Sequence, residues 1–175
     1  MRAKFSTSKN VLSTPAYETK NDIALSKRSK LVPLMNQMLA DAVDLQTQAK
    51  QAHWNVKGPH FIALHKLFDD IYVDVGGYVD LIAERLVQLG GIALGTVRVS
   101  ANNSRLEEYP LNLSDGCDHV EALSSALAKF GHLARKAIDD TDKLGDRDSA
   151  DIFTQVSSGI DKWLWFVEAH AQAEK

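Results

Sequence analysis

Apolar residues recur at the three-to-four-residue spacing of an amphipathic helix in four long stretches of the chain. The first stretch is expected to be helical from about Ser26–Lys30 to Val56. Pro33 fits best in the first turn, where its missing N–H has no helical partner to lose, so the regular helix should start near Ser29. The inward-facing residues of this helix are Leu34, Met38, Ala42, Leu45, Ala49 and Ala52.

Gly58-Pro59 breaks the first pattern, and a second helix is expected from Phe61 to about Leu89. At about 100° per residue, its apolar residues gather on one side as a core stripe. This stripe consists of Leu64, Phe68, Ile71, Val75, Ile82 and Leu86.

A third helix is expected near residues 118–141, opened by a capping box of Asp118 and Glu121. A fourth is expected from about Asp148 to Ala171. The inward residues of the fourth helix are Ile152, Val156, Ile160, Leu164 and Val167.

The segment between the second and third helices, Ile92 to Gly116, is long enough to cross a helical bundle instead of turning back. Tyr109-Pro110-Leu111 offers apolar anchors that could hold it against the bundle. The predicted fold class is all-α: a ferritin-like four-helix bundle with one long crossover that carries a short helix.

Composition supports one globular domain: the chain has 175 residues, 45% of them hydrophobic and 25% charged. Cys117 is the only cysteine, which excludes an intrachain disulfide and a cysteine-rich metal cage. No apolar run reaches the length of a membrane span, and the N-terminus lacks the apolar core of a secretory signal. We therefore expect a cytoplasmic protein without a membrane partner, one that can associate with the nucleoid.

Metal-ligand residue types lie on the other side of the second helix, roughly 100–200° from the core stripe. His65 and Asp69 form one i,i+4 pair, and Asp80 and Glu84 form another. His65 and Glu84 are about 28 Å apart along the axis, and Asp69 and Asp80 about 16 Å, so no single ion can contact both pairs of one straight helix. Taken alone, each pair is more typical of a solvated polar face than of a metal site.

A second copy of the helix, antiparallel about a two-fold axis, removes this difficulty. One register places His65 opposite Glu84 and Asp69 opposite Asp80, twice over. Its centre falls beside Gly76-Gly77, and close approach of two backbones would explain two glycines that each cost about 1 kcal/mol inside a helix. His53, in the last turn of the first helix, is expected near His65 across the tight hairpin.

Several of these residues resemble the signatures of the Dps family, the mini-ferritins known as DNA-binding proteins from starved cells. The resemblance covers about residues 20–168. It is carried by His53-Trp54, Gly58, Leu64-His65, Asp69, Asp80, Ala83-Glu84-Arg85, Leu89-Gly90-Gly91, Asp161-Lys162 and Leu164-Trp165-Phe166.

The resemblance implies a hollow homo-dodecamer, built from two-fold dimers, that oxidises Fe(II) and stores ferric mineral. Hydrogen peroxide is the oxidant the family prefers, with dioxygen as the other choice. Each site would take His53, His65 and Asp69 from one subunit and Asp80 and Glu84 from its mate. Trp54 is either a packing residue or, as the family suggests, an electron relay.

The chemistry of the ligand set agrees with iron. Two imidazoles and three carboxylates, with no thiolate, suit Fe(II), Mn(II) or Zn(II) better than Cu(I) or an iron–sulfur cluster. Carboxylate-rich ligation stabilises Fe(III) relative to Fe(II), which favours oxidation of bound iron. Zinc could substitute in the same site.

The N-terminal segment is basic, whereas the whole chain has a formal net charge of −3. Residues 1–22 are expected to form a flexible tail ahead of a bundle domain at 23–175. Arg2, Lys4 and Lys9 could contact DNA phosphates without reading bases, and repetition around an assembly would add avidity. The alternative is an ordinary solvated terminus.

Six aspartates stand between the third and fourth helices: Asp139, Asp140, Asp142, Asp146, Asp148 and Asp151. Taken alone, such a cluster is usually a solvated helix start that matches the helix dipole. Repeated about a three-fold axis it would attract cations. By resemblance, Asp148 and Asp151 match the residues that line iron pores in the family.

Two other function classes remain open at this point. One is a structural DNA-compacting protein whose metal site is vestigial or filled with zinc. An intrachain di-iron oxygenase is disfavoured, because it needs carboxylates that face its own bundle core.

Trp163 and Trp165 are expected in packing or at an interface. No role is assigned to His60, His119, His132 and His170.

Overall fold

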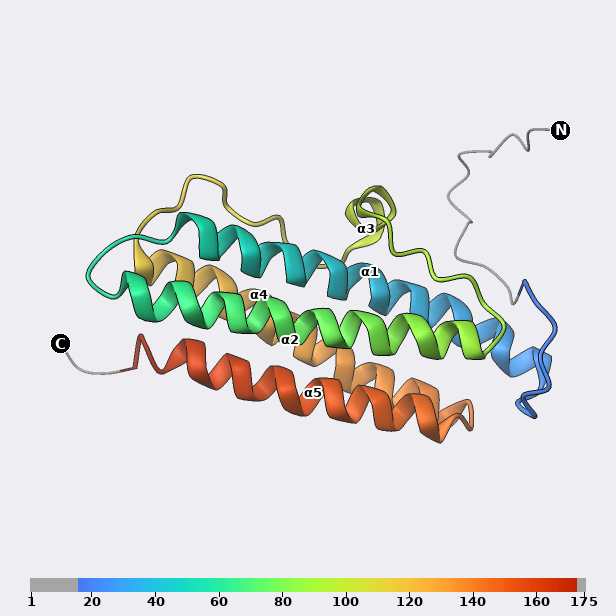
Figure 1. The fold of residues 1–175 in the computed structure, drawn as a ribbon. Coiled ribbons are helices and arrows are strands. Elements are labelled where there is room, and N and C mark those ends of the chain that lie inside the picture. The colour runs from blue at the N-terminus through green and yellow to red at the C-terminus, as the bar shows by residue number, and fades with distance from the viewer. Residues whose placement is uncertain (1–15, 173–175) are drawn as a thin grey trace, which may run out of the picture.

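The computed structural model describes residues 16–172, and that part of the chain contains five helices and no strand. Four long helices pack lengthwise as a bundle (Figure 1). The helices are α1 (Leu25–Asn55), α2 (Phe61–Gln88), α3 (Val97–Asn103), α4 (Gly116–Lys143) and α5 (Arg147–Glu168). The remaining helix, α3, is short and lies outside the bundle against α1. No described helix is both long and apolar enough to cross a membrane.

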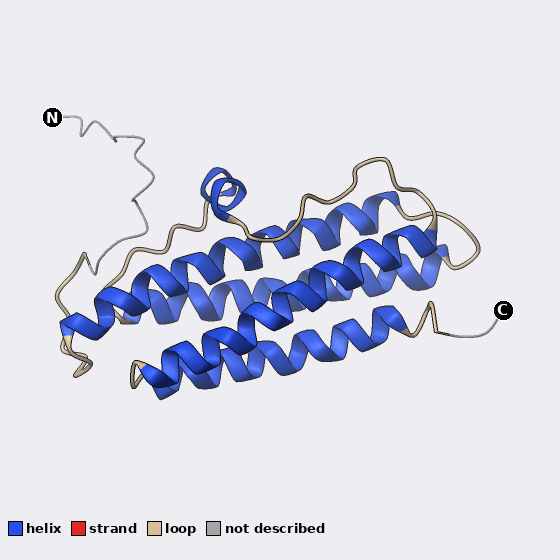
Figure 2. Ribbon diagram, turned by 180° about the vertical axis from the view of Figure 1, so that it is seen from behind, coloured by secondary structure: helices blue, strands red, loops and turns tan. Residues whose placement is uncertain are grey.

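Two helical hairpins, α1–α2 and α4–α5, face each other, and the crossover between them runs along the outside of α1 (Figure 2). The helix count and the position of the short helix confirm the predicted four-helix bundle with one crossover. The start of α1 and the end of α5 lie at opposite ends of the bundle (Figure 1).

The core stripe predicted for α2 is confirmed, since all six of its residues are at most 2% exposed. Phe68 of α2, Phe130 of α4 and Phe153 of α5 belong to the same buried core, and all three are fully enclosed. Burying a side chain of this size contributes roughly 1.5–3 kcal/mol. Of the other predicted inward residues, three are only half-buried at the margin of the core: Leu34, Ile152 and Leu164.

Helix α1 begins earlier than the sequence predicts, so Pro33 lies inside the helix and not in its first turn. The expected start near Ser29 is wrong because Arg28 fixes the preceding turn. The Arg28 side chain donates Nε to the Ile23 carbonyl at 2.9 Å and Nη1 to the Leu89 carbonyl at 3.1 Å. These bonds and the surrounding core offset the roughly 3 kcal/mol that an interior proline costs.

The predicted capping box of α4 is also wrong. Asp115 caps this helix, accepting a hydrogen bond from the Cys117 backbone N–H at 2.8 Å. The helix start is fixed from outside, because the Lys57 N–H donates to the Ser114 carbonyl at 2.8 Å. Gly116 packs so closely on Leu64 that a Cβ there would lie 2.8 Å from a Leu64 methyl.

The crossover is held to the bundle mainly by polar side chains. Arg105 donates Nη2 at 2.5 Å and Nε at 3.0 Å to the carboxylate of Asp41, which is fully buried in α1. Burial raises the pKa of Asp41 even though Arg105 opposes that shift. Tyr109 is the apolar anchor that the sequence predicts, and its hydroxyl lies 2.7 Å from Nδ1 of the buried His119. Leu111, by contrast, is 73% exposed.

Replacing Arg105 with Met should lower the free energy of unfolding by about 3–5 kcal/mol at neutral pH, because Asp41 loses the cation that balances it. Acidification should shrink this loss, since a protonated Asp41 needs no cation and its pKa is already raised. Thermal and urea unfolding followed by circular dichroism would measure both effects.

The exposed Arg98 of α3 provides the matched control, and Arg98→Met should stay within about 0.5 kcal/mol of the parent. Adding Asp41→Asn to Arg105→Met should recover most of the loss. Equal destabilisation by Arg98→Met and Arg105→Met would show that the buried pair does not fix the crossover.

Candidate metal centre

The α1–α2 hairpin brings two predicted ligands into contact. His53 lies in the last turn of α1 and His65 in the second turn of α2, and their rings stack with centroids 3.7 Å apart at 21°. Gly58 makes the tight connection possible, because its φ of 108° lies in a region that other residues rarely adopt. The Phe61 ring lies 5.0 Å from the His65 ring.

The two histidines fix each other's tautomer. Nδ1 of His53 lies 2.7 Å from the His65 carbonyl, and Nδ1 of His65 lies 2.8 Å from the His53 carbonyl. A carbonyl only accepts, so each Nδ1 carries the hydrogen, and in a neutral ring the lone pair is then on Nε2. Metal-binding histidines are usually held in this way, with one nitrogen donating to a carbonyl and the other left for the metal.

Asp69 lies beside this pair, with Oδ1 4.0 Å from Nδ1 of His53. The carboxylate forms an ion pair with Lys50 of α1, and this lysine, more than the nearby histidines, lowers the pKa of Asp69. Lys50 was missed by the sequence analysis. Its side chain also lies over the Tyr72 ring, 4.8 Å from the centroid. Asp69 is therefore an ionised ligand candidate whose present partner is a lysine.

Asp80 and Glu84 do not join this group within one chain. Both are exposed on α2, about 16 and 22 Å beyond Asp69 along the helix axis. Across the described residues of the single chain, no three or more His, Cys, Asp or Glu side chains are grouped so that they could hold a metal ion. The hairpin pairs His53 with His65 and puts Asp69 beside His53, but these three do not form a metal-holding group within one chain, and the other two predicted ligands lie on open surface.

The glycines at the predicted two-fold centre have different environments. A Cβ on Gly76 would lie 2.6 Å from Nε2 of Gln46, the flexible end of a side chain from α1 of the same chain. A Cβ on Gly77 would have no neighbouring atom within 4 Å. Close approach of two chains beside these glycines stays a prediction.

Trp54 does not pack within this chain, since it is 67% exposed. It lines a cavity of about 810 Å³ together with Lys50 and Tyr72 of the bundle and residues of the crossover. Trp163 is buried and donates Nε1 to Asp74 at 2.6 Å, whereas Trp165 is 62% exposed.

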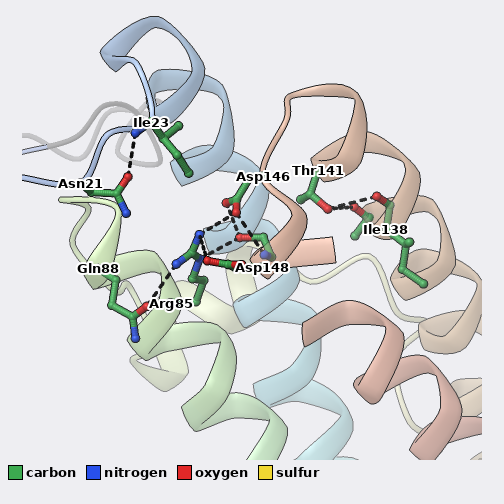
Figure 3. Close-up of polar contacts among 10 residues, drawn as sticks. Asn21, Ile23, Arg85, Gln88, Ile138, Thr141, Asp146 and Asp148 are labelled. Carbon is green, nitrogen blue, oxygen red and sulfur yellow. Dashed lines mark hydrogen bonds and ion pairs between the residues drawn. The ribbon is translucent and has the colours of Figure 1, made fainter. Parts of the chain in front are cut away.

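The predicted pore residues lie at the far end of α2, where α4 turns into α5. Asp148 and Asp151 are both exposed. Asp146 differs from them: it is 1% exposed, caps α5, and forms an ion pair with Arg85 at 2.6 Å (Figure 3). It does not contribute to an exposed acidic surface, so the six-aspartate cluster of the sequence contains at least one structural member.

The predicted DNA contacts, Arg2, Lys4 and Lys9, lie outside the described residues. At the start of the described part, the backbone N–H groups of Ala16 and Tyr17 donate to the Gly90 carbonyl at 2.8 and 3.0 Å. The division into a tail at 1–22 and a bundle domain at 23–175 stays a prediction.

Comparison with known proteins places this chain in a family. A family model described as a ferritin-like domain matches residues 33–175. The DNA protection during starvation protein of Agrobacterium fabrum is 44% identical over 156 residues, which are 89% of this chain and 96% of that protein.

Solved structures agree. DpsA14 from Streptomyces coelicolor superposes with a TM-score of 0.86 at 30% identity, covering 92% of this chain and 95% of the other. Dps from Microbacterium arborescens in the high iron form gives 0.80 at 28% identity, with 90% and 100% covered. On the family model, the identity and the coverage, this chain belongs to the Dps family of ferritin-like proteins.

Proposed function

We propose that this protein is a ferroxidase and iron-storage mini-ferritin that oxidises Fe(II), preferably with hydrogen peroxide, and so protects DNA. The observation that carries the proposal is the His53–His65 pair: both Nδ1 atoms donate to carbonyls, which leaves both Nε2 atoms for a metal ion. The name of the Agrobacterium relative refers to DNA protection, and the Microbacterium structure is of a high iron form.

Each oxidation site is proposed to lie between two subunits. His53, His65 and Asp69 of one chain would meet Asp80 and Glu84 of the partner subunit in the antiparallel register of two α2 helices. The open space around Gly77 and the exposed apolar side chains of Trp54, Ile62 and Val73 support contact along this face. The homo-dodecamer built from such dimers rests on family membership.

The donor set suits iron as a substrate. Imidazole and carboxylate groups bind Fe(II), and carboxylates favour the ferric product. Lys50 forms an ion pair with Asp69 and would be displaced when the carboxylate binds iron. Two Fe(II) ions each give one electron to a hydrogen peroxide molecule, whose O–O bond breaks. Water supplies the remaining oxygen of the ferric oxyhydroxide and releases protons. Zn(II) fits the same donors but has no redox chemistry, so it would inhibit.

A structural DNA-compacting protein whose metal site is vestigial or filled with zinc is the rival. The paired histidines argue against a vestigial site, because their reciprocal hydrogen bonds keep both Nε2 atoms available as ligands. Iron-dependent peroxide consumption would argue against a zinc-filled site. DNA binding is proposed as a separate property of the tail residues Arg2, Lys4 and Lys9. Iron uptake is proposed at Asp148 and Asp151, which are exposed at the start of α5.

The shared site predicts a particular result from mixed subunits. His65→Ala and Glu84→Ala should each nearly abolish iron-dependent peroxide consumption. In a heterodimer of the two variants one site carries both lesions and the other carries neither, so mixing should restore about half the sites of that fraction. Stopped-flow oxidation after confirmed subunit exchange measures this.

His132→Ala, on the exposed surface of α4, is the control and should oxidise iron like the parent. A mixture that stays as inactive as both single variants after exchange would rule out ligands shared between chains.

The proposed pore predicts a dependence on salt. Asp148→Asn with Asp151→Asn should slow Fe(II) uptake several-fold at low ionic strength and much less at high, because ions screen a field that attracts cations. The rate of mineral formation across a salt series measures it, with Asp118→Asn combined with Glu121→Gln, both exposed on α4, as the charge-matched control. A defect of the same size at every salt concentration contradicts an electrostatic role.

The tail can be tested separately from the metal site. Deleting residues 1–15 should abolish retardation of DNA in a gel while leaving peroxide consumption unchanged. Because the contacts are to phosphates, the binding of the full chain should fall steeply with salt and show no sequence preference. Undiminished retardation by the truncated protein would place DNA binding elsewhere.

A further inference from the structure

Arg85 is a buried cation at the C-terminal end of α2, only 6% exposed. A buried guanidinium needs acceptors for its donors. Figure 3 shows where they come from: Nη2 donates to Asp146 at 2.6 Å and Nη1 to Gln88 at 3.3 Å. Nε donates to the Ser149 hydroxyl at 3.1 Å. Except for Gln88, these partners belong to the start of α5.

The partners of Arg85 also bind one another. Asp146 caps α5 by accepting from the Ser149 backbone N–H at 3.2 Å and from the Ser149 hydroxyl at 2.5 Å. Both residues are at most 1% exposed. Arg85, Asp146 and Ser149 therefore form a closed, buried network, here termed the Arg85 network, which determines where α5 begins and how its first turn is oriented.

The same guanidinium reaches the exposed acidic surface. Nη2 of Arg85 lies 3.5 Å from Oδ2 of Asp148, whose side chain is 81% exposed. Nη2 of Arg85 therefore has two acidic neighbours: it donates to the buried carboxylate of Asp146 and lies near, but not in hydrogen-bond contact with, the exposed carboxylate of Asp148. An ion pair this open to water is weak, so Asp148 is free to exchange Arg85 for an incoming cation.

We propose that Arg85 is a positioning residue for iron uptake: through the Arg85 network it orients the first turn of α5, and it supplies the weak counter-charge that Asp148 gives up when Fe(II) arrives. The inference rests on the proposed function of Asp148. The sequence patterns give Arg85 no role in iron uptake, so this role is new. Arginine is required because a lysine ammonium cannot donate to Asp146, Ser149 and Asp148 from a planar, fixed set of nitrogens.

This arrangement also connects the proposed site of iron uptake with the proposed site of iron oxidation. Arg85 directly follows Glu84, a proposed iron ligand, on the same rigid helix. The helix that would bind iron for oxidation therefore also anchors the surface that would admit it.

A double-mutant cycle between Arg85→Lys and Asp148→Asn tests the inference on the assembled protein. Each single variant should raise the apparent KM for Fe(II) about fivefold while changing kcat less than about twofold, because uptake is impaired and the oxidation site is intact. The double variant should be no worse than Asp148→Asn alone, since Arg85 acts through Asp148. A purely structural role would lower kcat or Tm and multiply with the Asp148 effect.

Ser149→Ala tests the same role from the partner's side of the hydrogen bond. It can replace Arg85→Lys in the cycle if the Arg85→Lys variant does not assemble. It removes one partner of Arg85 and of Asp146, so it should raise KM and show the same non-additivity with Asp148→Asn. Arg98→Lys, on the exposed surface of α3, controls for the substitution itself and should leave KM unchanged.

The outcomes separate this inference from the function on which it rests. A parent protein that oxidises no iron overturns both. A parent that oxidises iron, with an Asp148→Asn variant of raised KM, keeps the proposed function. If in that case Arg85→Lys and Ser149→Ala leave KM unchanged, or multiply with Asp148→Asn, the positioning role of Arg85 is overturned. An unaltered KM in Asp148→Asn overturns it as well.

Discussion

The burial of one side of α2 fixes the position of everything proposed on the other side. Phe68, Ile71, Val75 and Ile82 are fully enclosed, so the helix cannot turn about its axis without exposing them. Each would lose roughly 1.5–3 kcal/mol on exposure. That constraint leaves Asp69, Asp80 and Glu84 on the outer surface. A straight helix of 28 residues is about 42 Å long, so its outward ligands must serve separate sites.

Periodicity predicted most of the fold because it reports this burial directly. The limits of α2 agree with the expected ones to within a residue, and its core stripe is complete. The His53–His65 contact was predictable for a different reason: a helix break of a few residues brings the flanking turns together whatever the rest of the chain does.

The wrong helix-end predictions and the missed polar contacts also have a common cause. Asp115 and Asp118 both satisfy the local rules for a helix cap, and contacts of the neighbouring loop with Lys57 decide between them. Arg28 reaches a carbonyl 61 residues away, and Arg105 a carboxylate 64 residues away. Polar partners at such separations leave no period in the sequence. Lys50 was missed similarly, because its bond to Asp69 depends on how α1 and α2 are rotated against each other.

The reciprocal bonds between His53 and His65 have a consequence for how such a site changes over generations. Each ring is oriented by the other residue's main chain. The His53 carbonyl lies at the end of α1, where the Lys57 N–H donates to Ser114 instead, and it accepts from the His65 ring. The two ligands therefore depend on each other structurally, and a substitution of one disturbs the orientation of the other. Loss of the His65 ring would leave the His53 carbonyl at the hairpin without its partner, so a chain that loses this metal ligand also has a weakened turn.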